Sequence, residues 1–461
     1  GCDRSPGTSH PGREAIATAE DAATLIQRKL DAIRLSGAPV TLEELDHWAP
    51  APKASENGAI AWTNAFAALT VLPTNAPAFL DRHSTSTPKV RRYFQYILTT
   101  NKLALERMHQ ASGFVQAGYQ RDQRDWMFYN SDGTLKRHGF LMGENIQRAA
   151  EVLAIEARIK GEAREFEHAV HSITTMVSLS RSLEHPSWGS SGWHDSFIAN
   201  CLARQTSEWL LSQDLLPLAQ LRLLQESFRD AVASETPTRL LIADRCIDIA
   251  RFQHWEEQII PSLMWDLWAQ MWKQNPDGAH PDGEPPWPTN LVAAMKVDFA
   301  KVKDAEFLFY LTEMERLISA SRLALPQALQ IARNVTATAK EREHQMQNNQ
   351  VVAYAPRLIS IKAASVSLFA SITALRQVAE TAMAVEQYRT LHEGRLPTEL
   401  NALVPTYLAA VPTDPFDGRP LRFRLLTRGY VIYSIGPDGQ DNGGKDMNST
   451  GYSDITFNVR R

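Results

Sequence analysis

The sequence lacks several features that would point directly to a partner or a reaction. Its 48 lysine and arginine residues are slightly outnumbered by 52 aspartate and glutamate residues, and the formal net charge is -4. This balance provides no global basic field, so it argues against nucleic acid as a partner. No stretch approaches about 18 uninterrupted apolar residues, so the pattern predicts no membrane-spanning helix. Walker loops, HExxH helices and GxSxG elbows are also missing from the chain, which therefore carries no catalytic signature.

Cysteine is scarce as well. The three cysteines form no CxxC or Cys/His spacing of the kind that indicates structural zinc. Cys201 and Cys246 lie in apolar helical contexts, where buried free thiols are favoured over the alternative of one disulfide. Cys2 follows Gly1 in a chain that does not begin with methionine, as at the cleavage point of a bacterial lipoprotein signal. Lipidation of Cys2 is one hypothesis, and a tag residue beside an ordinary cysteine is the other.

Residues 1–13 are expected to form a flexible tether. The tract from Ser5 to Gly12 is rich in proline, glycine, serine and threonine and has no apolar period. If Cys2 is lipidated, this tract would join the folded body to a membrane, and the anchor would be the membrane's only contact. The expected location is the bacterial cell envelope, either periplasmic or lipid-anchored.

What remains is an ordinary globular composition, with 44% hydrophobic and 22% charged residues. A chain of 461 residues is long enough for two or three domains. Apolar residues recur with a helical period nearly everywhere up to about residue 393. The sequence predicts a mostly α fold, with a multi-helix body over residues 14–350 and a small α+β module over residues 355–461. The proline-rich and Asp-Gly-rich tract 275–290 is a candidate boundary inside the body.

Local signals divide the body into helices. The Thr41 to Glu44 spacing matches a capping box that opens a short helix. One long helix is expected to run unbroken from Phe140 to about Leu183, where His185-Pro186 stops it. Other helices are expected over residues 87–113, 196–213, 238–274 with a break at Pro261, 291–320, 326–345 and 356–393.

Three patterns in the body are candidates for chemistry. Glu165, His168 and His171 share one helix face and resemble half of a carboxylate-bridged metal site, although a solvated polar face is favoured because the second half is missing. His194 and Asp195 follow a glycine-rich loop with two tryptophans, where a pocket could form. A stripe of tryptophans could stack on a ligand, but a stripe at helical spacing is more often core; its members are Trp265, Trp268 and Trp272.

The last seventy or so residues are the most informative part of the chain. Leu421 to Leu425 alternates apolar and basic residues, Thr427 to Gly429 reads as a turn, and Tyr430 to Ser434 returns as a second strand. The preceding helix has an apolar stripe that a sheet would cover, and Gly394 lies where a helix C-cap is expected. The pattern predicts a helix packed on an antiparallel hairpin.

Two motifs in this region carry a resemblance. They are Asp414-Pro415-Phe416-Asp417-Gly418 and Tyr433-Ser434-Ile435-Gly436-Pro437-Asp438-Gly439. Residues 370–461 resemble the C-terminal half of the major pseudopilin of type II secretion, and residues 48–69 are similar to a segment of large bacterial envelope proteins that carry the same end. The resemblance implies a shared C-terminal fold and an envelope location. It does not imply a filament subunit, because the helix carries Lys362, Arg376 and Glu380 and follows some 350 residues.

The pseudopilin resemblance also implies a calcium loop. On this chain Asp438 and Asp454 match the family's acidic positions, and Asp441 and Asp446 lie between them as further ligands. Carboxylates and backbone carbonyls gathered in this way suit a hard, oxygen-liganded cation. The spacing from Asp446 to Asp454 is longer than in the family, so a solvated Asp/Gly turn without an ion is an equal alternative.

These observations predict a non-enzymatic binding or scaffold protein of the cell envelope, with a calcium-stabilised loop near its C-terminus. The partner would be a protein or small-molecule ligand that the sequence does not specify. The alternative is an envelope hydrolase with a pocket near residues 186–195. An ionisable group there with a shifted pKa would favour the alternative.

Overall fold

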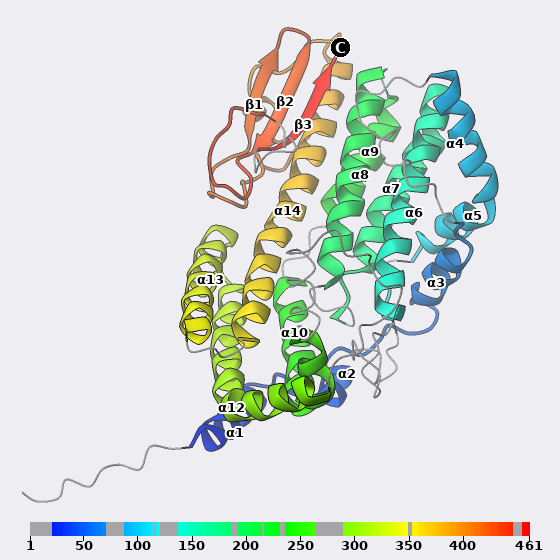
Figure 1. Ribbon diagram of the computed structural model, residues 1–461. Helices are drawn as coiled ribbons and strands as arrows, with labels where there is room; N and C mark the ends of the chain where they lie inside the picture. The colour runs from blue at the N-terminus through cyan, green and yellow to red at the C-terminus, as the bar shows by residue number, and fades with distance from the viewer. Residues whose placement is uncertain are drawn as a thin grey trace, which may run out of the picture.

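The protein is mostly α-helical and ends in a small antiparallel sheet, as the sequence predicts (Figure 1). The computed structural model describes residues 21–70, 87–114, 116–119, 137–186, 191–213, 216–230, 236–263, 289–348, 353–445 and 454–461. The first set of helices is α1 (Ala22–Leu35), α2 (Leu42–Trp48), α3 (Ala59–Ala67), α4 (Pro88–Thr100), α5 (Lys102–Ala111), α6 (Arg137–Glu162) and α7 (Phe166–Ser182). The remainder is α8 (Ser191–Gln213), α9 (Leu218–Asp230), α10 (Thr236–Gln253), α12 (Thr289–Ala320), α13 (Leu325–Asn348), α14 (Ala355–Leu391) and a short 3-10 turn, Leu400–Leu403.

Helix α14 is the axis of the molecule. Its first half packs on α10, α12 and α13, and its second half packs on α8, α9 and the sheet (Figure 1). The hydrophobic core is accordingly divided into two main clusters. One gathers α3 to α9, the C-terminal half of α14 and the sheet, and the other gathers α1, α10, α12, α13 and the N-terminal half of α14. One helix therefore supplies a wall to both cores.

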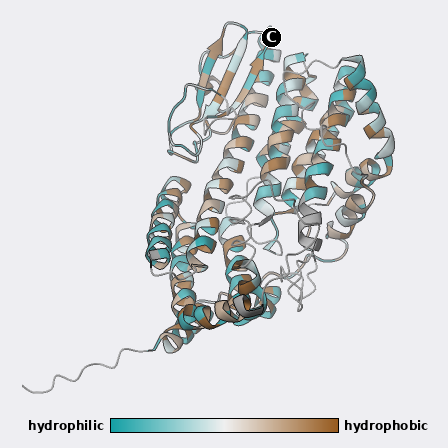
Figure 2. Ribbon diagram, viewed as in Figure 1, coloured by the Kyte–Doolittle hydropathy of each residue, from teal (hydrophilic) through white to brown (hydrophobic). Residues whose placement is uncertain are grey.

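The composition of α14 fits this central position. Among the residues that the structure describes, it is the one helix long and apolar enough to cross a membrane. In its most apolar 18-residue window, 72% of the window is buried inside the protein, as in the core helix of a soluble domain. Apolar colour in Figure 2 lies along α14 and the strands, whereas α4 at the periphery is largely hydrophilic.

Three expected helix boundaries are wrong. The segment 139–184 is a hairpin of two helices, because α6 ends at Glu162 and the chain turns through Arg164, whose φ is 61°. The backbone N–H of Arg164 bonds the carbonyl of Gly161 at 3.0 Å, which closes the turn. Residues 87–113 are likewise interrupted at Asn101, between α4 and α5. Further on, the break expected at Pro261 lies instead at His254, and the helix that follows continues through the proline.

The capping box at the start of α2 is confirmed, with one difference. The Thr41 hydroxyl accepts the backbone N–H of Glu44 at 3.1 Å. The Glu44 carboxylate reaches back to the N–H of Val40 at 2.7 Å rather than to that of Thr41. Its other oxygen accepts from Arg34 at 2.9 Å, so the cap also ties α2 to α1.

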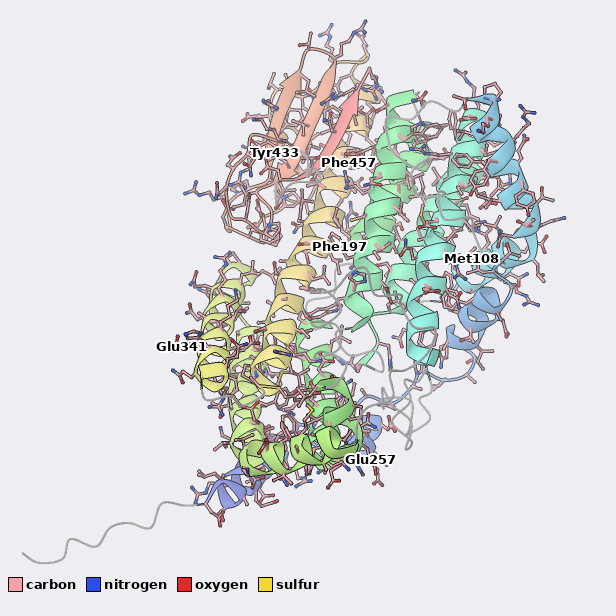
Figure 3. All side chains as sticks on the ribbon, viewed as in Figure 1. Met108, Phe197, Glu257, Glu341, Tyr433 and Phe457 are labelled. Carbon is pink, nitrogen blue, oxygen red and sulfur yellow. The ribbon has the colours of Figure 1, made fainter. Side chains whose placement is uncertain are left out.

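The sheet has three antiparallel strands in the order β1 (Arg422–Leu426), β2 (Gly429–Ser434) and β3 (Ile455–Arg460). The register pairs Phe423 with Ile432 and Ile432 with Phe457, and the face that carries these residues covers the end of α14 (Figure 3). The Tyr430 hydroxyl on this face donates to the carbonyl of Ala382 at 3.4 Å. The predicted hairpin is therefore present.

The loop after β2 folds back across the opposite face of the sheet. A Cβ atom at Gly444 would lie 3.0 Å from Tyr433 Cδ1 and 3.1 Å from Val431 Cγ1. Both side chains belong to β2 and are buried, although they point away from α14. Only glycine, with a φ of 74° here, lets the loop approach the strand this closely. Residues 436–445 consequently form a cover for the outer face.

Candidate functional site

The predicted calcium residues lie in this covering loop. Asp438 accepts the N–H of Gln440 and the side-chain amide of Asn442, both at 3.0 Å. Asp441 accepts the N–H of Gly443 at 2.9 Å. Asp454, immediately before β3, accepts the N–H of Asn442 at 3.1 Å with one oxygen and that of Gly444 at 2.6 Å with the other. Asp446 lies outside the described residues.

The electrostatics of Asp454 set it apart from the other two aspartates. Burial raises the pKa of Asp454 from its usual value, and the negative charges of Asp441 and Asp438 raise it further, while the two backbone N–H donors oppose the rise. The whole Asp454 residue is only 1% exposed. Three carboxyl groups on one loop therefore repel one another, and a cation placed among them would relieve that repulsion.

The residues that the structure describes do not provide a complete set of metal ligands in this loop. Within the portion of the chain that the structure describes, no group of three or more histidine, cysteine, aspartate or glutamate side chains is positioned to hold an ion. Asp438 and Asp441 direct their carboxylates to loop N–H groups in typical Asx-turn fashion. The geometry is that of an ordered Asp/Gly turn which carries excess negative charge.

A neighbouring carboxylate cluster is satisfied by an arginine that the sequence analysis did not single out. Asp414 is fully buried and accepts from Phe416 N at 2.9 Å, Ser434 Oγ at 2.8 Å and Ile435 N at 2.9 Å. Arg422 Nη1 completes the set at 2.6 Å. The DPFDG and YSIGPDG motifs are thus joined through one carboxylate.

Arg422 also neutralises the rest of the acidic turn. Its guanidinium donates to Asp417 and lies 3.6 Å from Asp441. Burial would raise the pKa of Asp417, but the hydrogen bonds from Arg422 and from the backbone of Arg419 outweigh it and leave the pKa lowered. The positive charge of Arg422 is therefore shared between the turn and one edge of the loop. The alternating basic pattern of β1 was visible in the sequence, but its partners were not.

The candidate hydrolase pocket near residues 186–195 is only partly described. Residues 187–190 lie outside the described ranges, and His194 and Asp195 are in the first turns of α8. The His194 side chain is 73% exposed, that of Asp195 is 16% exposed, and His194 Nδ1 lies 3.5 Å from Asp195 Oδ1. Burial raises the pKa of Asp195, and His194 opposes the rise. This pair has a partly buried acid beside an exposed base.

Next to this pair, the polar side chains of α7, α8 and α14 are engaged with one another. Arg376 donates to Asn200 Oδ1 at 3.1 Å, to Ser180 Oγ at 2.9 Å and to Glu184 Oε1 at 2.5 Å. The hydroxyls of Ser180 and Ser196 are 2.7 Å apart, and both serines are fully buried. Neither hydroxyl is exposed to a substrate. The network joins three helices and has the character of a structural core.

The charges of α14 that distinguish it from a pseudopilin helix all meet partners in the helical body. Lys362 Nζ lies 3.2 Å from Asp244 Oδ2 and 3.4 Å from Asp248 Oδ2, within α10. Tyr310 of α12 donates to Asp248 at 2.8 Å, and burial raises the pKa of Tyr310 well above its usual value. Glu380, further along α14, accepts from Arg229 of α9 at 2.8 Å. These ionic contacts therefore fix the position of α14 within the helical body.

Of the proposed half-site, the structure keeps Glu165 and His168 together, with His168 Nδ1 3.7 Å from Glu165 Oε2, but turns His171 toward another helix. Glu165 precedes α7 and pairs with Lys160 at 2.7 Å, and the His168 side chain is 68% exposed. His171 instead stacks on His109 of α5, with ring centroids 4.4 Å apart. All three residues are exposed, so the favoured prediction of a solvated polar face is confirmed. The predicted tryptophan stripe, like Cys2, lies outside the described residues.

The His109 ring is the centre of a polar cluster that sequence spacing could not reveal. Its Nε2 lies 2.8 Å from Glu156 Oε2, and its Nδ1 lies 3.0 Å from the Thr175 hydroxyl. Ser172 donates to the same Glu156 oxygen at 2.8 Å. Burial would raise the pKa of Glu156, but the bond and charge of His109 lower it overall. One carboxylate thus supports two stacked histidines.

The two remaining cysteines are free thiols. Burial raises the pKa of Cys201 to about 11 and that of Cys246 to about 12. Thiols of this kind are inert at neutral pH.

Comparisons with known proteins identify no relative: no family model, no curated protein and no solved structure matches the chain.

Proposed function

We propose that this chain is a non-enzymatic binding or scaffold protein of the bacterial cell envelope, in which calcium stabilises the loop from Asp438 to Asp454. The observation that carries the calcium part is the position of Asp454, a buried carboxylate flanked by two further aspartates on a glycine-rich loop. Because Asp454 ends the loop immediately before β3, a cation held there would fix the start of the third strand of the sheet.

The scaffold part rests on how the polar side chains are used. The buried polar side chains of α7, α8 and α14 bond to one another between helices; they are Ser180, Ser196, Asn200 and Arg376. Lys362 and Glu380 of α14 are paired with charged residues of the helical body. Such contacts hold surfaces in fixed positions, which is what a binding protein requires. The pseudopilin-like motifs and a lipidated Cys2 would add the envelope location.

Calcium binding is tested by thermal unfolding in chelator and in millimolar calcium. An ion that binds only the folded state stabilises it by about 2.7 kcal/mol when its concentration is a hundred times the dissociation constant. We expect the midpoint to rise in the wild type and to stay unchanged in Asp438→Ala and Asp454→Asn. Asp298→Asn is the matched control, because Asp298 is an exposed aspartate on α12. An equal rise in all four proteins, or no rise in the wild type, would leave a plain Asp/Gly turn.

The envelope location is tested on the precursor with its own signal sequence. A lipidated protein should partition into the detergent phase, and its Cys2→Ser form should remain in the aqueous phase. Equal partitioning would contradict lipidation and leave the calcium proposal intact.

A hydrolase is the second candidate, and the partly buried Asp195 beside His194 favours it. A general acid needs a raised pKa, and that of Asp195 is raised by burial. A panel of chromogenic ester, phosphate and glycoside substrates tests this candidate. Turnover that is present in the wild type and lost in both Asp195→Asn and His194→Gln would replace the scaffold proposal with an enzyme.

A further inference from the structure

The two edges of the C-terminal sheet differ. On the β3 side, Arg204 of α8 donates to the carbonyl of Thr456 at 2.5 Å, and Glu208 accepts the N–H of Asn458 at 2.6 Å. These bonds satisfy backbone groups that would otherwise be free. On the β1 side, Thr413 bridges Pro420 just before the strand, but no described strand pairs with the outer edge of β1 itself, and no helix lies beyond it in Figure 1. An open edge of this kind presents unpaired N–H and C=O groups to a further strand.

The open edge of β1 runs from the acidic end of the sheet toward its basic end. Arg424 on β1, Arg428 in the turn and Arg460 at the end of β3 are all exposed, and none forms an ion pair among the residues described here. Arg428 and Arg460 are adjacent, because Gly429 pairs with Arg460. Asp414, Asp417 and Asp441 lie at the opposite end of the strands, where they surround Arg422. At the basic end, Glu386 of α14 pairs with Arg461. The exposed arginines of the sheet are therefore separated along the strands from these three aspartates.

Side chains along β1 alternate in chemistry as well. Arg424 lies on the outer face of the sheet, whereas Leu425 lies on the α14 face yet remains 47% exposed because it is at the edge. A strand added beside β1 would place its own side chains alternately next to these two residues. Acidic residues would suit the outer face, and apolar residues would suit the α14 face.

We propose that the outer edge of β1 binds an extended acidic segment of a partner protein, which adds as a fourth strand and pairs its carboxylates with Arg424 and Arg428. The inference rests on the proposed binding role and names its site and its class of partner. A second copy of this chain is a poor occupant, because two β1 strands side by side would bring arginine against arginine. Main-chain bonds would give the affinity, and the charges would give the choice of partner.

The test uses the whole chain and a labelled peptide in which glutamate alternates with valine, followed by fluorescence anisotropy. We expect saturable binding that weakens as salt is added. Arg424→Glu should weaken it by about tenfold or more, which corresponds to about 1.4 kcal/mol. Arg322→Glu, at an exposed arginine after α12, is the matched control and should bind as the wild type does.

Two further peptides separate strand addition from simple charge attraction. The same sequence with alternate backbone amides methylated keeps every carboxylate but removes the donors, so it should lose binding. A lysine-valine peptide should not bind. The proposal is overturned if the methylated peptide binds as tightly as its parent, if Arg424→Glu binds normally, or if the glutamate peptide does not bind at all. None of these outcomes depends on calcium or on Asp195, so the failure of this site can be told from the failure of the proposed function.

Discussion

Glu208 and Asn458 are 250 residues apart in sequence, and the carboxylate of the first accepts the backbone N–H of the second at 2.6 Å. The same Glu208 oxygen accepts from Arg204 at 2.7 Å, and Arg204 in turn donates to the carbonyl of Thr456. Both charged residues are almost fully buried. A buried ion pair thus covers the edge of β3 in the way that a neighbouring strand would.

Removing one partner should be costly. In Glu208→Ala the Arg204 charge stays buried without its carboxylate, and we expect a loss of about 3–5 kcal/mol in the free energy of unfolding. Denaturant unfolding measures the loss. Glu226→Ala, at an exposed glutamate on α9, should change stability by no more than about 0.5 kcal/mol. Similar losses in the two variants would show that the bond does not hold the sheet to α8.

Gly429 and Gly394 both have a positive φ, so alanine substitutions at the two positions form a matched pair that tests the packing of β3. A Cβ atom at Gly429 would lie 1.9 Å from the carbonyl oxygen of Val459, whereas one at Gly394 would meet nothing within 4 Å. Gly394→Ala should cost about 1–2 kcal/mol, the strain of a left-handed residue. Gly429→Ala must also push β3 away, so it should cost at least about 3 kcal/mol. Equal costs would mean that β3 is free to shift.

The Arg376 network should behave as a structural unit. Arg376→Ala leaves Glu184, Asn200 and Ser180 without their shared donor, and we expect a loss of about 3–5 kcal/mol. Arg376→Lys should recover little, because an ammonium cannot reach three acceptors in the plane of a guanidinium. Arg333→Ala, at an exposed site on α13, is the control. Full rescue by lysine would indicate that charge alone matters here.

The stacked histidines predict an acid-sensitive contact between α5 and α7. Burial and the charge of His109 lower the pKa of His171, against an opposing effect of Glu156 and with a further lowering by His168. As pH falls, the His171 ring is therefore protonated in the unfolded chain before it is protonated in the folded protein. The contribution of His171 to stability is present above about pH 6.5 and is lost as pH falls toward the pKa of His171 in the folded protein. His171→Gln should flatten the fall of the thermal midpoint below pH 6.5. His344→Gln, an exposed histidine on α13, should leave the pH profile unchanged.

Much of the fold could be predicted because local patterns decide it. The helical period, the Thr41 cap and the alternation in β1 are properties of neighbouring residues, and all three predictions are confirmed. The break between α6 and α7 was missed because its reason is tertiary. A Cβ atom at Gly161 would lie 2.8 Å from Leu210 and 2.9 Å from Trp209 of α8, so a close helix contact explains the glycine in the last turn of α6. In the sequence, Gly161 was the residue that could have indicated this break.

The candidate site was less predictable. The DPFDG and YSIGPDG motifs marked the right segment, but the central residue proved to be Asp414, which binds both motifs together. Arg376 could not be assigned partners, because Ser180 lies 196 residues away and only folding brings the two together. The partners of Arg422 are 8 and 5 residues away, but the turn that aims Asp414 and Asp417 at it could not be read from the sequence. The calcium ligands remain a prediction from the resemblance.

The contact between α8 and β3 has a consequence for the order of folding. Arg204 and Glu208 bond to backbone groups 252 and 250 residues away, and those groups are in place only when β3 has paired with β2. Closing so long a loop costs entropy before the contact stabilises the chain, so this contact is expected to form late in folding. Until it forms, the charges of Arg204 and Glu208 stay uncovered, and a chain in that state is a natural target for quality-control proteases.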